Sequence, residues 1–377
     1  MASYRKRGKT WQYTISYTDK ETGKPEQIYK GGFRTKTEAI GEAEELEQSI
    51  KKGVQIKNNI TLAEHFESWI SMYKERQVTP TTVLKYKQSL SHIKELFPDI
   101  PLSQVNRSIY QTFLNNYADK HVKESTLRIH GHIKQSIQVA IDDKIITDDF
   151  TRRAIISGKK ESKPANQKFI SYSDTKKLLK YLVSHREPSL PNNYLLMLAF
   201  TTGLRYGELT GLTWNDIDFE NQRISVNKSY DYLYHTGFKP TKTETSKRTV
   251  DIDEFMTTLL RELRDNQKKE FKSLEVKNPL NLVFYHFSDG VPSNSGTNKL
   301  LKTLLQRLEI SPLISVHGAR HTYGSILIYK GVDIGIVSEV LGHKDVTITN
   351  EVYRHVIKEL REENRERLLG IQNELFM

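Results

Sequence analysis

The chain has 377 residues, and 57 Lys and Arg against 46 Asp and Glu give it a formal net charge of +11, which suits a polyanionic partner but also occurs in many ordinary basic proteins. It contains no cysteine, which excludes disulfides, thiolate zinc sites and cysteine nucleophiles and agrees with a reducing cytoplasm. Nothing resembles a signal peptide or an apolar run long enough to span a membrane, so we expect a soluble, cytoplasmic protein of two or three domains with no membrane partner.

The first expected domain covers residues 1–56 and contains a small sheet. Apolar and polar residues alternate strictly over Trp11–Tyr17, as they do in a half-buried strand. A turn is expected at Asp19–Lys24, and two more short strands at Gln27–Tyr29 and Gly32–Phe33. The sequence therefore predicts three strands.

One helix should follow these strands. The Thr35–Glu38 segment has the pattern of a capping box and predicts a helix running towards Lys52 and Gly53. Residues 1–36 hold nine Lys and Arg and three acidic residues. More than half of the excess positive charge thus lies on about a tenth of the chain, which favours a surface for a polyanion over an ordinary solvated face.

Residues 60–157 are expected to form a helical domain. Thr61–Glu64 is a second capping box, Thr79 precedes a proline at a first helical position, and Asn106 and Ser125 are expected to start two more helices. Apolar residues then recur at helical spacing at Val83, Tyr86, Leu90, Ile93 and Phe97. The pattern predicts a four-helix unit.

Residues 158–168 contain no large apolar side chain and are expected to be a flexible linker. The remaining chain, 169–377, is expected to be mainly helical with a small sheet from Arg223–Val226 and Arg248–Ile252. The fold class is therefore α+β and multidomain.

Chemistry-bearing residues gather in this last domain. Thr201–Leu209 contains Arg205 and follows the apolar segment Tyr194–Phe200, whose buried backbone would hold the guanidinium rigidly. A His-Gly-Ala-Arg-His-Thr run begins at His317, Leu-Gly-His begins at Leu341, and Val-Tyr-Arg-His begins at Val352. Ionising a phenol at pH 7 costs roughly 4 kcal/mol, since its reference pKa is about 10. Neighbouring Arg and His would lower this cost, so the order of groups suits attack on a phosphodiester.

Each of these residues taken alone has an ordinary structural explanation. Most of the nineteen tyrosines should be core or surface aromatics, a single histidine is more often a capping or core residue, and Arg205 could be an ion pair with Glu208. Only the joint order of H-x-x-R, L-G-H and V-Y-x-H is specific.

That ordered set resembles the tyrosine recombinases, of the phage-type integrase kind carried by temperate phages and by integrative elements of Gram-positive bacteria. The likeness covers essentially all 377 residues. It implies a small three-stranded arm-binding domain with one helix, a four-helix SAM-like core-binding domain, and a mainly α catalytic domain that ends in a C-terminal tail.

Carried over residue by residue, the resemblance implies two phosphate-clamping arginines, two histidines, one lysine and one tyrosine nucleophile. In chain order they are Arg205, Lys242, His317, Arg320, His343 and Tyr353. Lys242 is preferred for the hairpin lysine of the family because a turn-like run and then a β-branched run follow it, while Lys239 and Lys247 stay open. Glu208 would hold Arg205 in place.

The implied chemistry is transesterification. Tyr353 would attack the scissile phosphate in line, forming a 3′-phosphotyrosyl bond and freeing a 5′-hydroxyl, and a partner strand's 5′-hydroxyl would reverse the step. Arg205 and Arg320 would offer planar forks of donors to the non-bridging oxygens. Lys242 would protonate the leaving oxygen, His317 would move the proton of the phenol, and His343 would be an orienting donor. No cofactor and no metal are expected.

The resemblance also implies partners. These are double-stranded DNA at attachment core and arm sites, further copies of the chain in a homotetramer on that DNA, and an excision factor and a DNA-bending protein in the nucleoid of a bacterial host. Arg5, Arg7 and Arg34 are candidates for groove or phosphate contacts of the arm domain. The tail after Tyr353 is expected to dock either on its own subunit or on a neighbouring one.

Two other functions share part of the pattern. A type IB topoisomerase-like relaxing enzyme shares the chemistry but lacks this N-terminal arm domain, and a DNA-binding regulator would lack catalysis, whereas no member of the catalytic set is missing here. A metal-dependent transposase is disfavoured because these cations would compete with magnesium around the phosphate.

Overall fold

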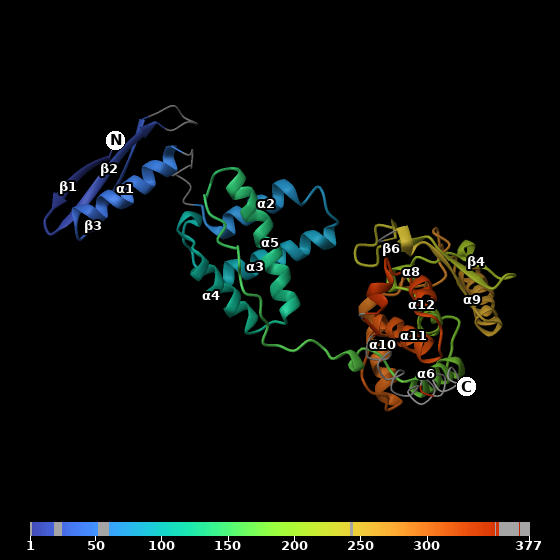
Figure 1. Ribbon diagram of the computed structural model, residues 1–377. Coiled ribbons are helices and arrows are strands. Elements are labelled where there is room, and N and C mark those ends of the chain that lie inside the picture. The colour runs from blue at the N-terminus through green and yellow to red at the C-terminus, as the bar shows by residue number, and fades with distance from the viewer. Residues whose placement is uncertain are drawn as a thin grey trace. The chain divides into compact units, whose positions relative to one another are not determined.

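The structure is a computed structural model, shown in Figure 1, and it describes residues 2–18, 25–51, 60–241, 244–350, 352–353 and 369. The chain divides into two compact units, Met1–Ser162 and Lys163–Met377. The expected turn at Asp19–Lys24, the end of the first helix at Lys52 and Gly53, Lys242 and nearly all of the tail after Tyr353 lie outside the described residues. Within those residues, no helix is both long enough and apolar enough to cross a lipid bilayer.

The chain begins with an antiparallel sheet in the order β1 (Ala2–Arg7), β2 (Thr10–Thr18) and β3 (Pro25–Phe33). Helix α1 (Lys36–Lys51) lies along one face of this sheet, as Figure 1 shows. Tyr13 and Ile15 alternate inward from β2 and bury against Ala39 and Ala43 of α1. The small alanines let the helix approach the sheet closely.

The sheet has three strands, as expected, but they cover partly different residues. The segments expected as two strands at 27–29 and 32–33 form the single strand β3. Gly31 pairs with Gln12 and Phe33 pairs with Trp11, and a register shift between these pairs accommodates Gly32. Strand β1 was not expected, since its charged sequence hides the alternation. The capping box is confirmed: Thr35 Oγ1 accepts from the Glu38 N–H, and the Glu38 carboxylate accepts from the Thr35 N–H.

Four helices follow, as expected, around an aromatic and aliphatic core that includes Phe66, Trp69, Phe113 and Ile133. They are α2 (Leu62–Tyr73), α3 (Pro80–Leu96), α4 (Arg107–Ala118) and α5 (Lys123–Asp142), with a short 3₁₀ turn at Leu102–Gln104.

The N-caps of three of these helices are those expected, at Thr61, Thr79 and Asn106. Helix α5 differs, because it begins two residues before Ser125, after the N-cap Val122, which has no capping side chain. The backbone of Gly158 lies against this helix start so closely that a Cβ there would collide with backbone atoms of Val122 and Lys123. Packing by a later segment thus sets the start of this helix.

The first residues of the expected linker are bonded to the four-helix unit. The Lys159 and Lys160 N–H groups donate to the carbonyl oxygens of Ala118 and His121, and the Ser162 hydroxyl donates to Glu124 at 3.1 Å. The division between the two compact units comes directly after Ser162.

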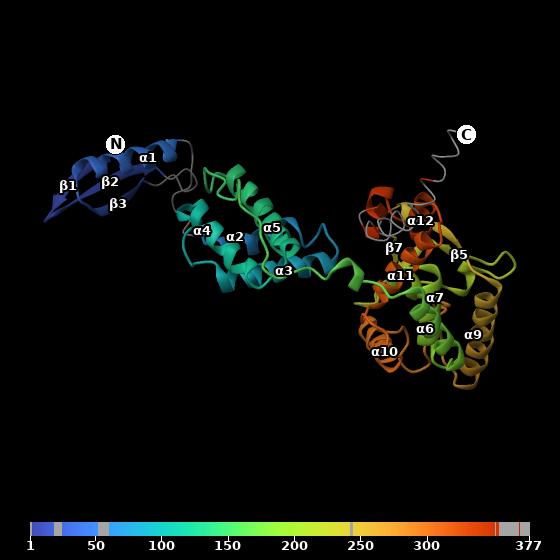
Figure 2. The same ribbon diagram turned by 60° about the horizontal axis from the view of Figure 1, so that its bottom comes forward.

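The second unit is built around α7 (Pro191–Thr202), a helix whose side chains are buried on nearly all sides. It packs against α6 (Tyr172–Ser184), α9 (Glu254–Ser273) and α11 (Val316–Tyr329), as Figure 2 helps to follow. The other described helices are α8 (Tyr206–Thr210), α10 (Asn294–Arg307) and α12 (Ile334–Leu341), with 3₁₀ turns at Ala165–Gln167, Trp214–Asp216 and Glu244–Ser246.

Two small sheets complete this unit. One is antiparallel in the order β4 (Ile217–Asp218), β5 (Arg223–Val226) and β8 (Arg248–Asp251); the other is the hairpin of β6 (Lys228–Tyr230) and β7 (Phe238–Pro240). The expected α+β class is confirmed: a three-stranded sheet with one helix, a four-helix unit and a mainly helical unit with small sheets.

Candidate active site

Arg205 stands at the sharp turn between two helices. Helix α7 ends at Gly203, whose φ of +65° is the left-handed conformation that terminates helices, and Arg205 is then the N-cap of α8. The flanking residues Leu204 and Tyr206 are buried. The backbone that carries the guanidinium is therefore fixed from both sides.

The Arg205 side chain is held by a carboxylate and by a carbonyl. Its Nη1 donates to Glu208 Oε1 at 2.7 Å, and its Nη2 donates to the Gly342 carbonyl at 2.9 Å. Glu208, only 3% exposed, also accepts from the Arg205 N–H through Oε2 at 3.0 Å. The expected support of Arg205 by Glu208 is thus a double contact, to side chain and backbone.

Arg320 lies inside the unit on α11 and is 3% exposed. Its Nη1 donates to the Gly203 carbonyl at 2.9 Å, and its Nη2 donates to the Leu341 carbonyl. Burial, and then the nearby charge of Arg205, lower the pKa of Arg320 to about 9, so the guanidinium keeps its proton at pH 7. Each guanidinium has five N–H groups, so donors remain on both arginines for a ligand.

A third arginine, which the sequence analysis did not single out, lies beside these two. Arg248 of β8 donates through Nε to the Val340 carbonyl at 2.6 Å and through Nη2 to Glu208 Oε2 at 3.0 Å. Its position could have been found from the strand pattern, because alternation places Arg248 on the same inward face as Val250 and Ile252. An arginine on an inward face requires buried partners.

Three successive carbonyls at the end of α12 thus each accept from a different arginine. These carbonyls have no partner within the helix and lie at the negative end of the helix dipole, so guanidinium groups are their natural ligands. Gly342 closes the helix with φ +63°, and a Cβ there would meet Arg248 Nη1 at 2.9 Å. The end of α12, which leads into His343, is therefore packed directly on the arginines.

The two expected histidines are both electrically neutral at pH 7. Burial, followed by the charges of Arg320 and Arg205, lowers the pKa of His317 and lowers that of His343 to about 4. His343 Nδ1 and the Thr349 hydroxyl are hydrogen-bonded at 2.7 Å. A neutral imidazole can accept a proton at one nitrogen and donate from the other.

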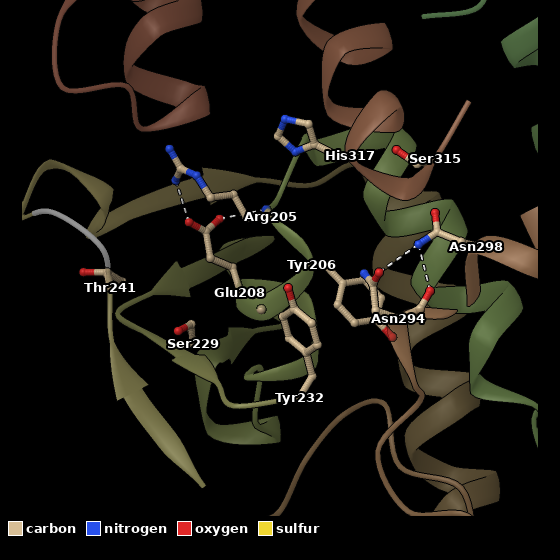
Figure 3. Close-up of a pocket in the computed structure, with 11 residues that line it drawn as sticks. Arg205, Tyr206, Glu208, Ser229, Tyr232, Thr241, Asn294, Asn298, Ser315 and His317 are labelled. Atoms are coloured by element: carbon tan, nitrogen blue, oxygen red, sulfur yellow. Dashed lines mark hydrogen bonds and ion pairs between the residues drawn. The ribbon is translucent and has the colours of Figure 1, made fainter. Parts of the chain in front are cut away.

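His317 and Arg205 line the same pocket, a space of about 470 Å³ shown in Figure 3. Tyr206, Tyr232 and Asn294 line it as well. In Figure 3 the His317 ring and the Arg205 guanidinium stand on the same side of this space. A group bound in the pocket would therefore meet a fixed cation and a neutral imidazole together.

Tyr353 is 1% exposed and lies against α11. Its hydroxyl donates to the backbone carbonyl of Arg320 at 3.4 Å, which is long for a hydroxyl donor. Burial raises the pKa of Tyr353 to about 12, while the charge of Arg320 acts in the opposite direction. The ring of His321 lies 6.2 Å from that of Tyr353 and 4.8 Å from that of His317.

Gly324 makes room for this tyrosine. A Cβ at position 324 would overlap the Tyr353 hydroxyl oxygen and lie 2.5 Å from its ring carbon Cζ. The hydroxyl therefore faces the backbone of α11, close to Arg320, and not the pocket that Arg205 and His317 line.

The three candidate lysines lie in different surroundings. Lys239 lies on β7 and its ammonium forms an ion pair with Asp231 at 2.8 Å. Lys247 is exposed just before β8. Lys242 lies outside the described residues, but the preceding residue, Thr241, lines the pocket with Arg205 and His317.

The arm-domain candidates are all exposed. In the register of β1 and β2, Arg5 faces Gln12 and Arg7 faces Thr10, while Tyr4 faces the buried Tyr13. Because directly opposed residues point to the same side of a sheet, Arg5 lies on the face away from α1. Arg34 directly follows β3.

Across the described ranges, no group of His, Asp and Glu is arranged to hold a metal ion. The site instead combines fixed cations, neutral imidazoles and a phenol, a set able to bind and attack a phosphodiester. The fold and this site define a class of DNA strand-transferring enzymes.

Comparison with known proteins gives the family. Residues 168–359 match the phage integrase family, 2–50 match an arm DNA-binding domain, and 61–118 match a phage integrase N-terminal SAM-like domain. The chain therefore belongs to the phage integrase family and is a tyrosine recombinase, an enzyme that cleaves and rejoins DNA.

Relatives and solved structures agree. The tyrosine recombinase XerC-like protein of Caldanaerobacter subterraneus subsp. tengcongensis is 30% identical over 401 residues, covering 100% of this chain and 99% of the relative. The ICEBs1 integrase of Bacillus subtilis is 30% identical over 185 residues, covering 48% of this chain and 50% of that protein.

Among solved structures, the Tn1549 transposon integrase in complex with transposon right end DNA has a TM-score of 0.66 at 17% identity, covering 81% of this chain and 99% of that chain. A lambda integrase tetramer bound to a Holliday junction has a TM-score of 0.58 at 18% identity, covering 89% and 94%. These two share the fold.

Proposed function

We propose that this recombinase integrates and excises a mobile element at specific DNA sites, with Tyr353 as its nucleophile. The observation that carries the proposal is the meeting of Arg205 and Arg320 on the adjacent carbonyls of Gly342 and Leu341, next to His343. The named relatives of an integrative element and a transposon support the mobile-element role.

The arginines act as a phosphate clamp. Both guanidiniums are held by backbone carbonyls, so their remaining N–H groups are fixed in direction before DNA binds. As Tyr353 attacks, negative charge grows on the non-bridging phosphate oxygens, and the two forks neutralise it. The P–O5′ bond breaks, a bond from phosphorus to the tyrosine oxygen forms, and the energy of the ester is kept for rejoining.

Proton transfer falls to the neutral imidazoles and to a lysine. His317, in the pocket with Arg205, takes the phenol proton, and His343 donates a hydrogen bond to the phosphate. Lys242 protonates the departing 5′-oxygen. The position of Thr241 at the pocket and the ion pair of Lys239 with Asp231 favour Lys242 over Lys239.

Tyr353 must leave its place on α11 before it attacks. Its hydroxyl is bonded to the Arg320 carbonyl and its raised pKa keeps it protonated. The 3.4 Å hydrogen bond to the Arg320 carbonyl is long and therefore weak, and a phosphate bound by the two arginines gives the released hydroxyl a group to attack.

The domains divide the contacts with DNA. Residues 1–56 bind arm sites through the open face of the sheet, residues 60–157 bind the core site, residues 158–168 link the units, and residues 169–377 cut and rejoin. Tyr29, 79% exposed, faces Thr14 on the same open face as Arg5. A homotetramer joins two attachment sites in the bacterial cytoplasm, assisted by an excision factor and a DNA-bending protein, with the tail after Tyr353 docked on its own or a neighbouring subunit.

The test is covalent trapping on a nicked core site, where the short strand carrying the 5′-hydroxyl diffuses away after cleavage. The wild-type chain should form a protein–DNA adduct in excess EDTA, and Tyr353→Phe should bind the same DNA without forming one. An adduct made by Tyr353→Phe would disprove this nucleophile, and dependence on magnesium would favour a metal-dependent mechanism.

A further inference from the structure

Arg248 is a buried arginine, and a buried guanidinium needs hydrogen-bond and charge partners. Its side chain is 5% exposed, on the inward face of β8. Burying an unpaired guanidinium is costly, so such a residue is kept only with good partners. The partners of Arg248 come from three separate segments of the catalytic unit.

The three contacts join the elements that build the site. Nη2 donates to Glu208 at 3.0 Å, Nε donates to the Val340 carbonyl at 2.6 Å, and Nη1 donates to the Ser246 carbonyl at 3.0 Å. Glu208 follows Arg205 on α8, Val340 lies in the last turn of α12, and Ser246 precedes β8. One rigid group therefore ties α8 and the end of α12 to the strand.

Glu208 is the link between the two arginines. Oε1 accepts from Arg205 and Oε2 accepts from Arg248, so the carboxylate is fixed between them. Burial by itself would raise the pKa of Glu208, but the charge and hydrogen bond of Arg248, followed by those of Arg205, outweigh it and the pKa is lowered. The carboxylate is therefore ionised when it orients Arg205.

We propose that Arg248 is a positioning residue for DNA cleavage. It sets the Glu208 carboxylate at the angle from which Glu208 aims Arg205, and it holds the end of α12, whose Gly342 carbonyl binds Arg205. This role rests on the proposed clamping of the phosphate by Arg205. Arg248 itself does not touch the phosphate.

A lysine at position 248 provides the discriminating change. Its single ammonium keeps the positive charge but cannot reach Glu208 and the Val340 carbonyl together in the geometry of a guanidinium. Arg248→Lys should therefore leave DNA affinity unchanged and let Arg205 drift. The matched control is Arg223→Lys, on neighbouring β5, where an exposed arginine pairs with Asp251 at the sheet surface.

The rates of adduct formation would be measured on two nicked core sites under single turnover. One has an ordinary scissile phosphate; the other carries a methyl group in place of one non-bridging oxygen and so lacks the charge that Arg205 neutralises. A defect that acts through Arg205 should shrink on the neutral substrate. A loss of folded enzyme would lower both rates equally, so the ratio of the two rates does not depend on it.

We expect Arg248→Lys to lose about 10- to 100-fold on the ordinary phosphate, the range for a lost charged hydrogen bond, and to lose distinctly less on the neutral one. Arg205→Lys should show the same pattern, and Arg223→Lys should match the wild type on both. Equal losses by Arg248→Lys on the two substrates would overturn the proposal.

A second measurement uses only the ordinary phosphate, and it serves if adduct formation on the neutral substrate is too slow to measure. On the ordinary phosphate, Arg205→Lys with Arg248→Lys should be no slower than Arg205→Lys alone, because the second change acts through the first residue. Losses that multiply would refute positioning through Arg205. If the wild-type chain forms no adduct on the ordinary phosphate, or Tyr353→Phe forms one, the proposed function fails and not the role of Arg248.

Discussion

At the scale of single residues, the positions that bind the end of α12 require arginine, and lysine cannot replace it. Each guanidinium at positions 205 and 320 binds one backbone carbonyl of this end and one further group, and still has N–H groups left. An ammonium offers three donors from a single point and no fixed plane. The geometry therefore makes a conservative substitution severe.

Arg205→Lys and Arg320→Lys should each slow cleavage by at least about 100-fold, the usual cost of removing one donor from a developing anion. Single-turnover adduct formation on a nicked core site measures this rate, and a band-shift assay should show nearly unchanged affinity. Near-normal cleavage by either variant would remove that arginine from the clamp.

Replacing Gly324 and replacing Gly131 by alanine should change the free energy of unfolding in opposite directions. Gly324→Ala places a methyl group on the Tyr353 ring, so it should destabilise the catalytic unit by about 1–3 kcal/mol, as overpacking does. Gly131→Ala, in α5 with nothing near its added Cβ, should stabilise the four-helix unit by about 0.5–1 kcal/mol through helix propensity. Urea unfolding followed by hydrogen exchange of peptides from each unit measures both. An unchanged stability of Gly324→Ala would show that Tyr353 does not dock there.

The pKa of His343 predicts how stability varies with pH. In the folded chain this pKa is about 4, below its ordinary value of 6.5. Between these values the unfolded chain binds a proton that the folded chain does not, so the free energy of unfolding should fall as the pH falls from 6.5 to 4. His343→Gln should make this fall shallower in urea titrations of the catalytic unit. An identical pH dependence in the variant would contradict the burial of a neutral His343.

At the scale of elements, local patterns predicted what local forces decide. The capping boxes at Thr35 and Thr61, the cap at Asn106 and the burial of the segment before Arg205 follow from neighbouring residues, and the structure has them all. Strand β1 was not predicted. Its pairing with β2 gives it a partly buried face, but its charged sequence shows no alternation of apolar and polar residues.

The candidate active site shows the same distinction between features set by neighbouring residues and features set by distant ones. Motifs of neighbouring residues indicated Arg205, His317, Arg320, His343 and Tyr353. The binding of three arginines by successive carbonyls of α12 joins residues far apart in sequence, and no local pattern carries that information. The docking of Tyr353 on Gly324 is a contact of the same long-range kind.

The arm domain provides the prediction at this scale. Deleting residues 1–56 should abolish binding to distal arm sites, because the open face of the sheet with Arg5 and Arg7 is lost. Cleavage of a short core site should continue, since the catalytic unit has its own core around α7. Binding to each site would be measured by band shift and cleavage by adduct formation. Equal loss of both activities would contradict this division of roles.

At the scale of the whole molecule, one chain joins an arm DNA-binding domain and a SAM-like domain to a unit in which the proposed phosphate clamp and the proposed nucleophile lie on neighbouring elements. The clamp is assembled before DNA binds, whereas the hydroxyl is held on the backbone of α11. In the proposed mechanism the enzyme binds DNA without cutting it until Tyr353 is released.

The most direct test identifies the amino acid that becomes joined to DNA. The wild-type adduct from a nicked core site would be digested with trypsin and nuclease and its nucleotide-bearing peptide sequenced by mass spectrometry. We expect a nucleotide linked through its 3′-phosphate to the oxygen of Tyr353. A nucleotide on any other residue, or one linked through a 5′-phosphate, would contradict the account.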